Sequence, residues 1–177
     1  LDEQVERMTS RKVPLPSGGY LTETVLVRLK NRLGLDDLVP IHRIDRDTAG
    51  LVLFAKQPAS RAAYCALFSQ HAVRKTYEAI APWRAGLSWP ITRSSRIQEA
   101  GHFMLQHEVA GTPNAITHID VLEVHGELAR YRLQPVTGQR HQLRVHMLGL
   151  GLPILNDGLY PTLTPEGQQD YARPLQL

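Results

Sequence analysis

The pattern of apolar and polar positions along the chain predicts short helices and strands in turn. Apolar residues recur at every fourth position of the segment 21–33, at Val25, Leu29 and Leu33. This spacing is typical of a helix that buries one face. We expect Thr22 to cap the helix at its start and Gly34 to end it, because glycine readily adopts the left-handed conformation that follows many helices.

Two further segments in the first half of the chain have readable patterns. Residues 50–55 form an apolar run after a polar loop, which predicts a buried central strand. Residues 59–69 predict a second helix with four side chains to bury: Ala62, Ala63, Ala66 and Leu67. We interpret Cys65 on this helix as a small core residue, the commoner role of a lone cysteine.

The second half of the chain predicts mainly strands. Residues 73–81 alternate between polar and apolar positions up to Pro82, as a half-buried strand does. Residues 116–124 and 128–133 read as two strands joined by a tight hairpin. The segment 83–111 shows no sustained periodicity of apolar and polar residues. Its sequence is therefore compatible with either short strands or a flap.

A last helix is expected after the turn at residues 135–138. Thr137 is placed to cap it, and the helix should run through Met147 and end at Gly149. Because strands and helices mix without the regular alternation of a parallel sheet, we predict an α+β fold. Its sheet should be mixed, mainly antiparallel, and flanked by helices.

Composition sets broad limits on the class of protein. The 177 residues are 42% hydrophobic and 21% charged, which predicts one globular domain over residues 1–177, or one domain built of two lobes. No apolar run approaches the roughly 20 residues of a membrane span, so no membrane partner is expected. One cysteine excludes an internal disulfide and favours the cytoplasm. A net charge of +3 permits nucleic acid as a partner.

The loop His42 to Ala49 is the first candidate for chemistry. It places Asp45 between Arg43 and Arg46, directly ahead of the apolar run. Neighbouring arginines keep a carboxylate ionised and also suit an anionic substrate. Asp45 can therefore be a nucleophile, a base or an acid, although an aspartate in such a loop is more often a turn residue.

Two arginines of the last predicted helix form a second candidate. Arg140 and Arg144 are four residues apart and would share a helix face near its positive end. That face would attract the Asp45 carboxylate or an RNA phosphate, while solvated surface arginines are an equal alternative. Tyr77 is either a sheet aromatic or a side chain that stacks on a base.

The motifs do not indicate a metal site or a nucleotide-binding site. His141 and His146 are five residues apart, so they do not share a helix face, and no ligand cluster accompanies them. There is no glycine-rich phosphate loop followed by lysine and serine or threonine. We therefore expect neither a metal nor a nucleotide cofactor.

Three ordered motifs together resemble the RluA-type family of RNA pseudouridine synthases. The first reads His-Arg-Ile-Asp, two residues, then Thr-Ala-Gly, at residues 42–50. The second is Lys-x-Tyr at Lys75 and Tyr77. The third reads Thr-Gly, two residues, then His-Gln-Leu-Arg-x-His at residues 137–146, followed by Gly-x-Pro-Ile and Asp-x-x-Tyr, which ends at Tyr160.

The resemblance implies a role for each motif residue. Asp45 would be the essential carboxylate that attacks the target uridine. Tyr77 would stack on the uracil and later remove the proton from its C5 atom. Arg144 would pair with Asp45, with Leu143 as an apolar wall of the pocket. The expected RNA-binding residues are His42, Arg43, Arg140, His141 and Gln142, with Arg43 entering the stack where the uridine flips out.

The same resemblance implies the wider setting. We expect a catalytic fold with an RNA-binding cleft, a monomer, no cofactor, and ribosomal or transfer RNA as substrate. No separate N-terminal RNA-binding domain is recognisable, and the chain looks clipped at both ends. A non-catalytic RNA-binding or chaperone protein of the same fold is the alternative. A carboxylate-dependent glycosidase or nuclease would need a second acid, for which Glu78 and Asp47 are the nearby residues.

Overall fold

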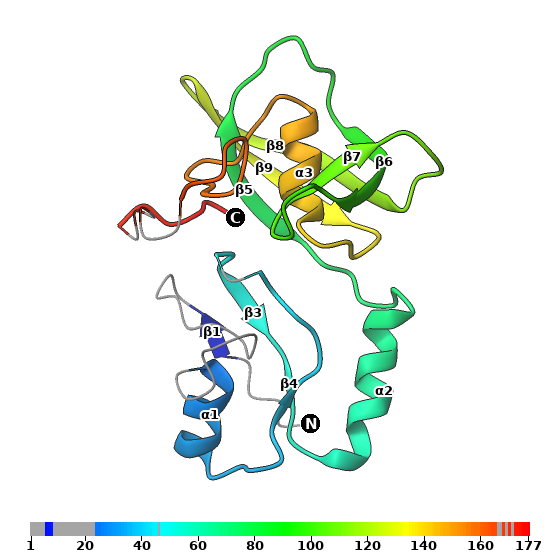
Figure 1. Cartoon of the computed structure of the whole chain (residues 1–177), viewed down its shortest axis with the longest axis vertical. Helices are drawn as coiled ribbons and strands as arrows, with labels where there is room; N and C mark the ends of the chain where they lie inside the picture. Colours follow the sequence, from blue (N-terminus) through cyan, green and yellow to red (C-terminus); the bar gives the residue numbers. More distant parts are fainter. Residues whose placement is uncertain (1–5, 9–23, 46, 166–167, 169, 171) are drawn as a thin grey trace. The chain divides into compact units, whose positions relative to one another are not determined.

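The chain forms two compact units, shown in Figure 1. The N-terminal unit comprises residues 1–73 and the C-terminal unit residues 74–177. This computed structural model describes residues 6–8, 24–45, 47–165, 168, 170 and 172–177. Each unit is described by itself below.

The N-terminal unit contains two helices and two small antiparallel ladders. Its elements are β1 (Glu6–Met8), α1 (Val25–Leu33), β2 (Val39–Pro40), β3 (Gly50–Val52), β4 (Phe54–Ala55) and α2 (Pro58–Ser69). β1 pairs with β3, and β2 pairs with β4. Arg61 of α2 donates to the carbonyl of Asp37, which joins this helix to the loop after α1.

Several expectations for this unit need correction. The N-cap of α1 is Thr24, whose hydroxyl accepts from the Val27 N–H at 3.3 Å, while Thr22 lies outside the described residues. Gly34 ends the helix in the left-handed conformation, as predicted. The expected central strand at 50–55 is instead split between β3 and β4, each in a two-stranded ladder among the described residues.

The expected buried face of α2 was also wrong. The helix itself occurs at Pro58–Ser69, but none of its residues is buried. Ala62, Ala63 and Leu67 are exposed, and so is Cys65, which was predicted as a core residue. Alanine-rich segments form helices by propensity alone, so their sequence predicts the helix without predicting a packing face.

The C-terminal unit is a five-stranded antiparallel sheet with one helix across a face (Figure 1). Its elements are β5 (Tyr77–Pro82), β6 (Ile91–Glu99), β7 (Gln106–Val109), β8 (Ala115–His125), β9 (Leu128–Pro135) and α3 (Gln142–Gly149). The strand order is β5-β9-β8-β6-β7. The predicted α+β class is confirmed, and every strand pair among the described residues is antiparallel.

The core of this unit follows from side-chain alternation on the central strands. Three residues of β9 are at most 1% exposed: Ala129, Tyr131 and Leu133. They pack with Leu143 and Met147 of α3 in one apolar cluster. Strand residues two apart point to the same face, so β9 presents one continuous apolar surface to the helix.

The helix α3 starts later than the sequence pattern indicated. It begins at Gln142, and its N-cap is His141 in the left-handed conformation (φ 53°), so Thr137 does not cap it. Arg140 therefore precedes the helix and does not share a helical face with Arg144. Thr137 instead accepts from the Ile116 N–H at 2.9 Å and donates to Gln142 Oε1 at 2.7 Å.

A directed chain of hydrogen bonds fastens α3 to the sheet. Gln142 Nε2 donates to Thr117 Oγ1 at 2.9 Å. The Thr117 hydroxyl is then left to donate to His146 Nδ1 at 2.8 Å, which places the imidazole proton on Nε2. That proton faces Ser95 Oγ at 3.0 Å. The chain needs a neutral His146, because a second ring proton would meet the Thr117 hydroxyl as another donor.

Burial keeps this histidine neutral. His146 has no solvent exposure, and burial lowers its pKa from 6.5 to about 4, against the opposing charge of Glu108. Glu108 lies 4.0 Å away and is itself paired with Arg93, whose Nε donates to it at 2.9 Å. The arginine therefore neutralises much of the field that would otherwise protonate His146.

The depressed pKa predicts a pH-dependent stability. The unfolded chain binds a proton on His146 near pH 6.5, and the folded chain binds it only near pH 4. Stability from this group is complete above about pH 6.5 and falls by about 3 kcal/mol as the pH drops toward 4. Urea unfolding followed by tryptophan fluorescence measures this in one unit, because both tryptophans, Trp83 and Trp89, lie in the C-terminal unit.

A matched pair of variants tests the assignment. His146→Asn should be less stable at pH 7 but should lose most of the pH dependence between pH 6.5 and 4.5. His118→Asn changes an exposed histidine of the same sheet and should keep the wild-type pH profile. An unchanged pH profile in His146→Asn would contradict the assignment.

Candidate active site

The loop that carries Asp45 is held by local contacts in the N-terminal unit. His42 Nε2 accepts from the Leu53 N–H at 3.0 Å, and the His42 ring stacks on Phe68 with centroids 4.7 Å apart. The Thr48 N–H donates to the Asp45 carbonyl at 3.1 Å and closes a turn. These contacts anchor His42 ahead of Asp45 and join the Asp45 carbonyl to Thr48.

The residues of this loop differ in solvent exposure. The difference separates residues that hold the loop in place from residues that face solvent. Thr48 is buried and Asp45 is half-buried, whereas Arg43 is exposed. His42, predicted among the RNA-binding residues, is half-buried and anchors the loop through the contacts above. The arrangement leaves a carboxylate and an arginine on a fixed backbone, which suits both positioned chemistry and contact with an anion.

The second and third motifs meet in the C-terminal unit, although they are 62 positions apart. Lys75 Nζ donates to the Thr137 carbonyl at 3.4 Å, and burial lowers the pKa of this lysine. Tyr77 begins β5 opposite Leu133 of β9. It packs against the apolar cluster that includes Leu143, so these two predicted pocket residues belong to one cluster.

Arg144 is the most deeply placed charge of the site. It is 2% exposed, and its Nε donates to Asp157 Oδ2 at 2.8 Å while its Nη2 donates to Asp157 Oδ1. Both side chains of this pair are 1% exposed. Two parallel hydrogen bonds to one carboxylate fix the plane of the guanidinium, which a lysine could not reproduce.

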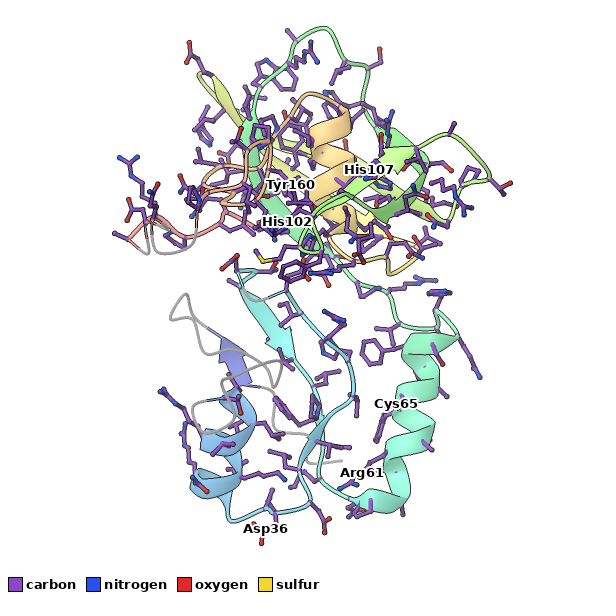
Figure 2. All side chains as sticks on the ribbon, in the orientation of Figure 1. Asp36, Arg61, Cys65, His102, His107 and Tyr160 are labelled. Atoms are coloured by element: carbon purple, nitrogen blue, oxygen red, sulfur yellow. The ribbon has the colours of Figure 1, made fainter. Side chains whose placement is uncertain are left out.

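Asp157 is itself held by the backbone that follows it. Its Oδ1 accepts from the N–H groups of Leu159 and Tyr160, at 2.8 and 3.1 Å. The Tyr160 ring lies 5.3 Å below the Arg144 guanidinium, and its hydroxyl accepts from the Gln106 N–H at 2.8 Å. Tyr160, labelled in Figure 2, is 5% exposed. One tight turn thus supplies both the counter-charge and the aromatic face for Arg144.

The remaining third-motif residues divide between buried and exposed positions. The Gln142 amide makes four hydrogen bonds within the chain and is 4% exposed, which indicates a role in holding α3 and not in contacting RNA. His141 is 8% exposed, with its Nδ1 at 3.0 Å from the Tyr160 hydroxyl. Arg140 is exposed, and its role as a phosphate contact stays a prediction.

Sequence reasoning did not identify Asp157 and Tyr160 as site residues. Their place in the third motif was a signal, since they follow the Arg144 segment at a set spacing. The ion pair itself joins a helix to a later loop, and no local pattern encodes such a contact. Asp45 lies in the N-terminal unit and Arg144 in the C-terminal unit, so the pairing of these two stays a prediction.

Metal and membrane features are not found in the described part of the chain. Its described residues contain no group of three or more His, Cys, Asp or Glu side chains suited to hold a metal ion. No described helix has the length and apolar character needed to cross a membrane.

The buried pair predicts a large loss of stability for Asp157→Asn. Asparagine keeps an oxygen for the two backbone N–H groups but removes the negative charge that faces the buried Arg144 guanidinium, which should cost about 3 kcal/mol. Glu78→Gln is the control, because Glu78 and Arg130 form an exposed pair at 3.3 Å whose loss should cost less than about 1 kcal/mol. Urea unfolding followed by tryptophan fluorescence compares them, and equal losses would contradict the assignment.

The comparisons with known proteins agree with the motifs. A family model described as RNA pseudouridylate synthase matches residues 12–148. An uncharacterized RNA pseudouridine synthase of Haemophilus influenzae is 36% identical over 141 residues, which cover 77% of this chain and 61% of that protein. The ribosomal large subunit pseudouridine synthase D of Haemophilus ducreyi is 34% identical over 125 residues, covering 68% and 37% respectively.

The fold has a solved counterpart. The human RNA Pseudouridylate Synthase Domain Containing 1 protein superposes with a TM-score of 0.69 over 86% of this chain and 64% of that chain, at 24% sequence identity. The chain spans 61% and 37% of the length of the two bacterial relatives, which is less than two thirds of each. The family model covers the segment that contains Asp45, Tyr77 and Arg144, and the chain therefore belongs to the RNA pseudouridylate synthase family.

Proposed function

We propose that this chain converts uridine to pseudouridine in structured RNA, with Asp45 as the nucleophile. The observation that carries the proposal is the match of residues 12–148 to the family. This range contains the first two motifs and the third motif as far as Leu148. The fixed turn around Asp45 and the rigid seating of Arg144 support it, because covalent catalysis requires groups held in place before the substrate arrives.

The proposed reaction is an isomerisation in which no atom is gained or lost. The bond between ribose C1′ and uracil N1 breaks, and its electron pair stays with the uracil ring. The uracil turns while it is held, and a new bond forms between C1′ and C5. A proton then leaves C5 and N1 ends with a proton. No redox partner or group donor is needed for this balance.

Each proposed catalytic residue has a physical task. Asp45 bonds to the sugar carbon that loses the base, and this bond breaks, with its electron pair returning to the carboxylate, when C5 bonds to that carbon. Tyr77 stacks on the uracil, so the detached ring stays in the pocket, and its hydroxyl gives its own proton toward N1 as it takes the C5 proton. Arg144 keeps Asp45 ionised and oriented, while Asp157 and Tyr160 hold the guanidinium that does so.

The proposed substrate is ribosomal or transfer RNA with an unpaired target uridine. The target must leave the base stack, because the glycosidic bond is out of reach within a helix. Exposed Arg43 is suited to fill the gap that the base leaves, and exposed Arg140 to bind a phosphate. We further propose that the chain acts as a monomer in the cytoplasm, in keeping with its single cysteine.

Replacement of the proposed nucleophile provides the central test. Asp45→Asn keeps the size of the side chain but removes its nucleophilic charge, so the rate should fall by at least about a thousandfold. Release of tritium from ribosomal and transfer RNA labelled at uridine C5, taken from cells lacking the gene, measures the rate.

The control is Asp47→Asn in the same loop, which should keep activity within about threefold. Absence of tritium release by the wild-type chain, or undiminished release by Asp45→Asn, would overturn the proposal. A non-catalytic RNA-binding protein would bind the RNA and release no tritium with either variant. Free uracil or cleaved strands would instead indicate a glycosidase or a nuclease.

Tyr77→Phe separates stacking from proton transfer. The phenylalanine ring preserves the stack, so the KM for RNA should change little, while kcat should fall about a hundredfold or more because a positioned proton acceptor is lost. Steady-state tritium release at several RNA concentrations gives both constants. An equal effect on kcat and KM would point to a binding role for the hydroxyl.

A further inference from the structure

The loop between β6 and β7 exposes an aromatic side chain that has no role in the proposed reaction. Phe103 is 66% exposed, more than any other large hydrophobic side chain in the described part of the chain. Figure 2 shows its neighbour His102 at the margin of the C-terminal unit. A single exposed apolar side chain is common on protein surfaces, so the case for a partner rests on the conformation of this loop and on the charge tied to it.

The loop is held in a defined conformation by its own hydrogen bonds. The Leu105 N–H donates to the His102 carbonyl at 2.8 Å, and the Ala100 N–H donates to the Leu105 carbonyl at 3.0 Å. The Met104 N–H donates to His102 Nδ1 at 3.3 Å. The His102 and Phe103 rings stack with centroids 5.0 Å apart and an interplanar angle of 27°. The exposed ring is thus presented on an ordered turn.

A cation is tied to the backbone of this loop. Arg140 Nη1 donates to the Phe103 carbonyl at 2.9 Å, which ties the loop to the residue preceding the N-cap of α3. Arg140 is exposed, and within the described residues the Phe103 carbonyl is the one hydrogen-bond acceptor recorded for its guanidinium. We call His102, Phe103 and Arg140 the Phe103 platform.

We propose that the Phe103 platform binds one unpaired base of the substrate RNA, other than the target uridine. A flat aromatic face beside a guanidinium matches a nucleotide, because the ring stacks on the base and the cation binds its phosphate. An apolar protein surface would not explain the adjacent cation. This inference rests on the proposed function for the identity of the partner, and Tyr77 is already assigned to the target uracil.

Stacking and general apolar contact are separable by substitution. Phe103→Ala should weaken RNA binding about tenfold, within the range typical of a lost base–aromatic stack. Phe103→Leu keeps an apolar side chain but loses the flat face, so it should bind as weakly as Phe103→Ala. Phe103→Trp should retain the wild-type affinity.

The experiment uses the full chain and a stem–loop RNA with a seven-nucleotide unpaired loop. Fluorescence anisotropy gives the Kd, and 2-aminopurine placed at each loop position in turn reports stacking through quenching. We expect quenching at one loop position with the wild-type chain and its loss with Phe103→Ala and Phe103→Leu. Thermal unfolding of each variant should match that of the wild type.

The control is Val124→Ala, which removes an exposed apolar side chain from the β8–β9 hairpin of the same unit. Its Kd should stay within about twofold of the wild-type value. Equal affinity of Phe103→Ala and the wild type, or wild-type affinity in Phe103→Leu, would overturn the inference and leave the proposed catalysis intact. Loss of tritium release with Phe103-dependent RNA binding preserved would overturn only the proposed catalysis. Absence of RNA binding by the wild-type chain would overturn both.

Discussion

The buried charge of Arg144 is the constraint on which the C-terminal unit depends. A guanidinium at 2% exposure cannot remain without a counter-charge, and Asp157 supplies it through two hydrogen bonds. To do so, the chain after α3 must turn back so that its carboxylate faces the helix. The same turn brings Tyr160 under the guanidinium, and Tyr160 in turn reaches β7 through the Gln106 N–H.

The other buried polar side chains of α3 also need partners within the fold. All six residues from Gln142 to Met147 are buried, and three of them are polar or charged. Arg144 is satisfied by Asp157, Gln142 by the backbone and hydroxyls around β8, and His146 by Thr117 and Ser95. These partners lie on three separate segments: the loop after α3, β8 with the turn that follows β9, and β6. The helix can therefore satisfy them together only in one position on the sheet, which makes it a rigid support for Arg144.

The difference between residues that hold the scaffold and residues that are proposed to bind the substrate explains which residues are buried and which are exposed. Residues that hold the scaffold, such as Gln142 and His146, are hidden, whereas Arg43, Phe103 and Arg140 reach the surface. In the proposed function, hidden residues determine where the reactive groups stand and exposed ones bind the RNA. A motif therefore mixes two kinds of residue, and only burial in the folded chain distinguishes them.

Local physics explains which elements could be predicted. The hairpin of β8 and β9 follows from alternating side chains and a Gly126 turn, and the end of α1 follows from Gly34. β6 was not predicted as a defined strand because its inward face carries Arg93 and Ser95, which pair with Glu108 and His146. The side chains of β6 therefore alternate in burial without alternating between apolar and polar types. The buried face predicted for α2 was wrong because helix propensity does not encode packing.

By itself, the sequence determined the α+β class, the strands β5, β8 and β9, and the three motifs that mark the family, since these depend on local periodicity and on residue order. Tertiary structure alone decided that Arg144 is held by Asp157, that Gln142 and His146 fasten α3, and that Phe103 is left exposed. The physical reason is that hydrogen bonds and ion pairs between distant segments depend on burial, and burial exists only after the chain has folded.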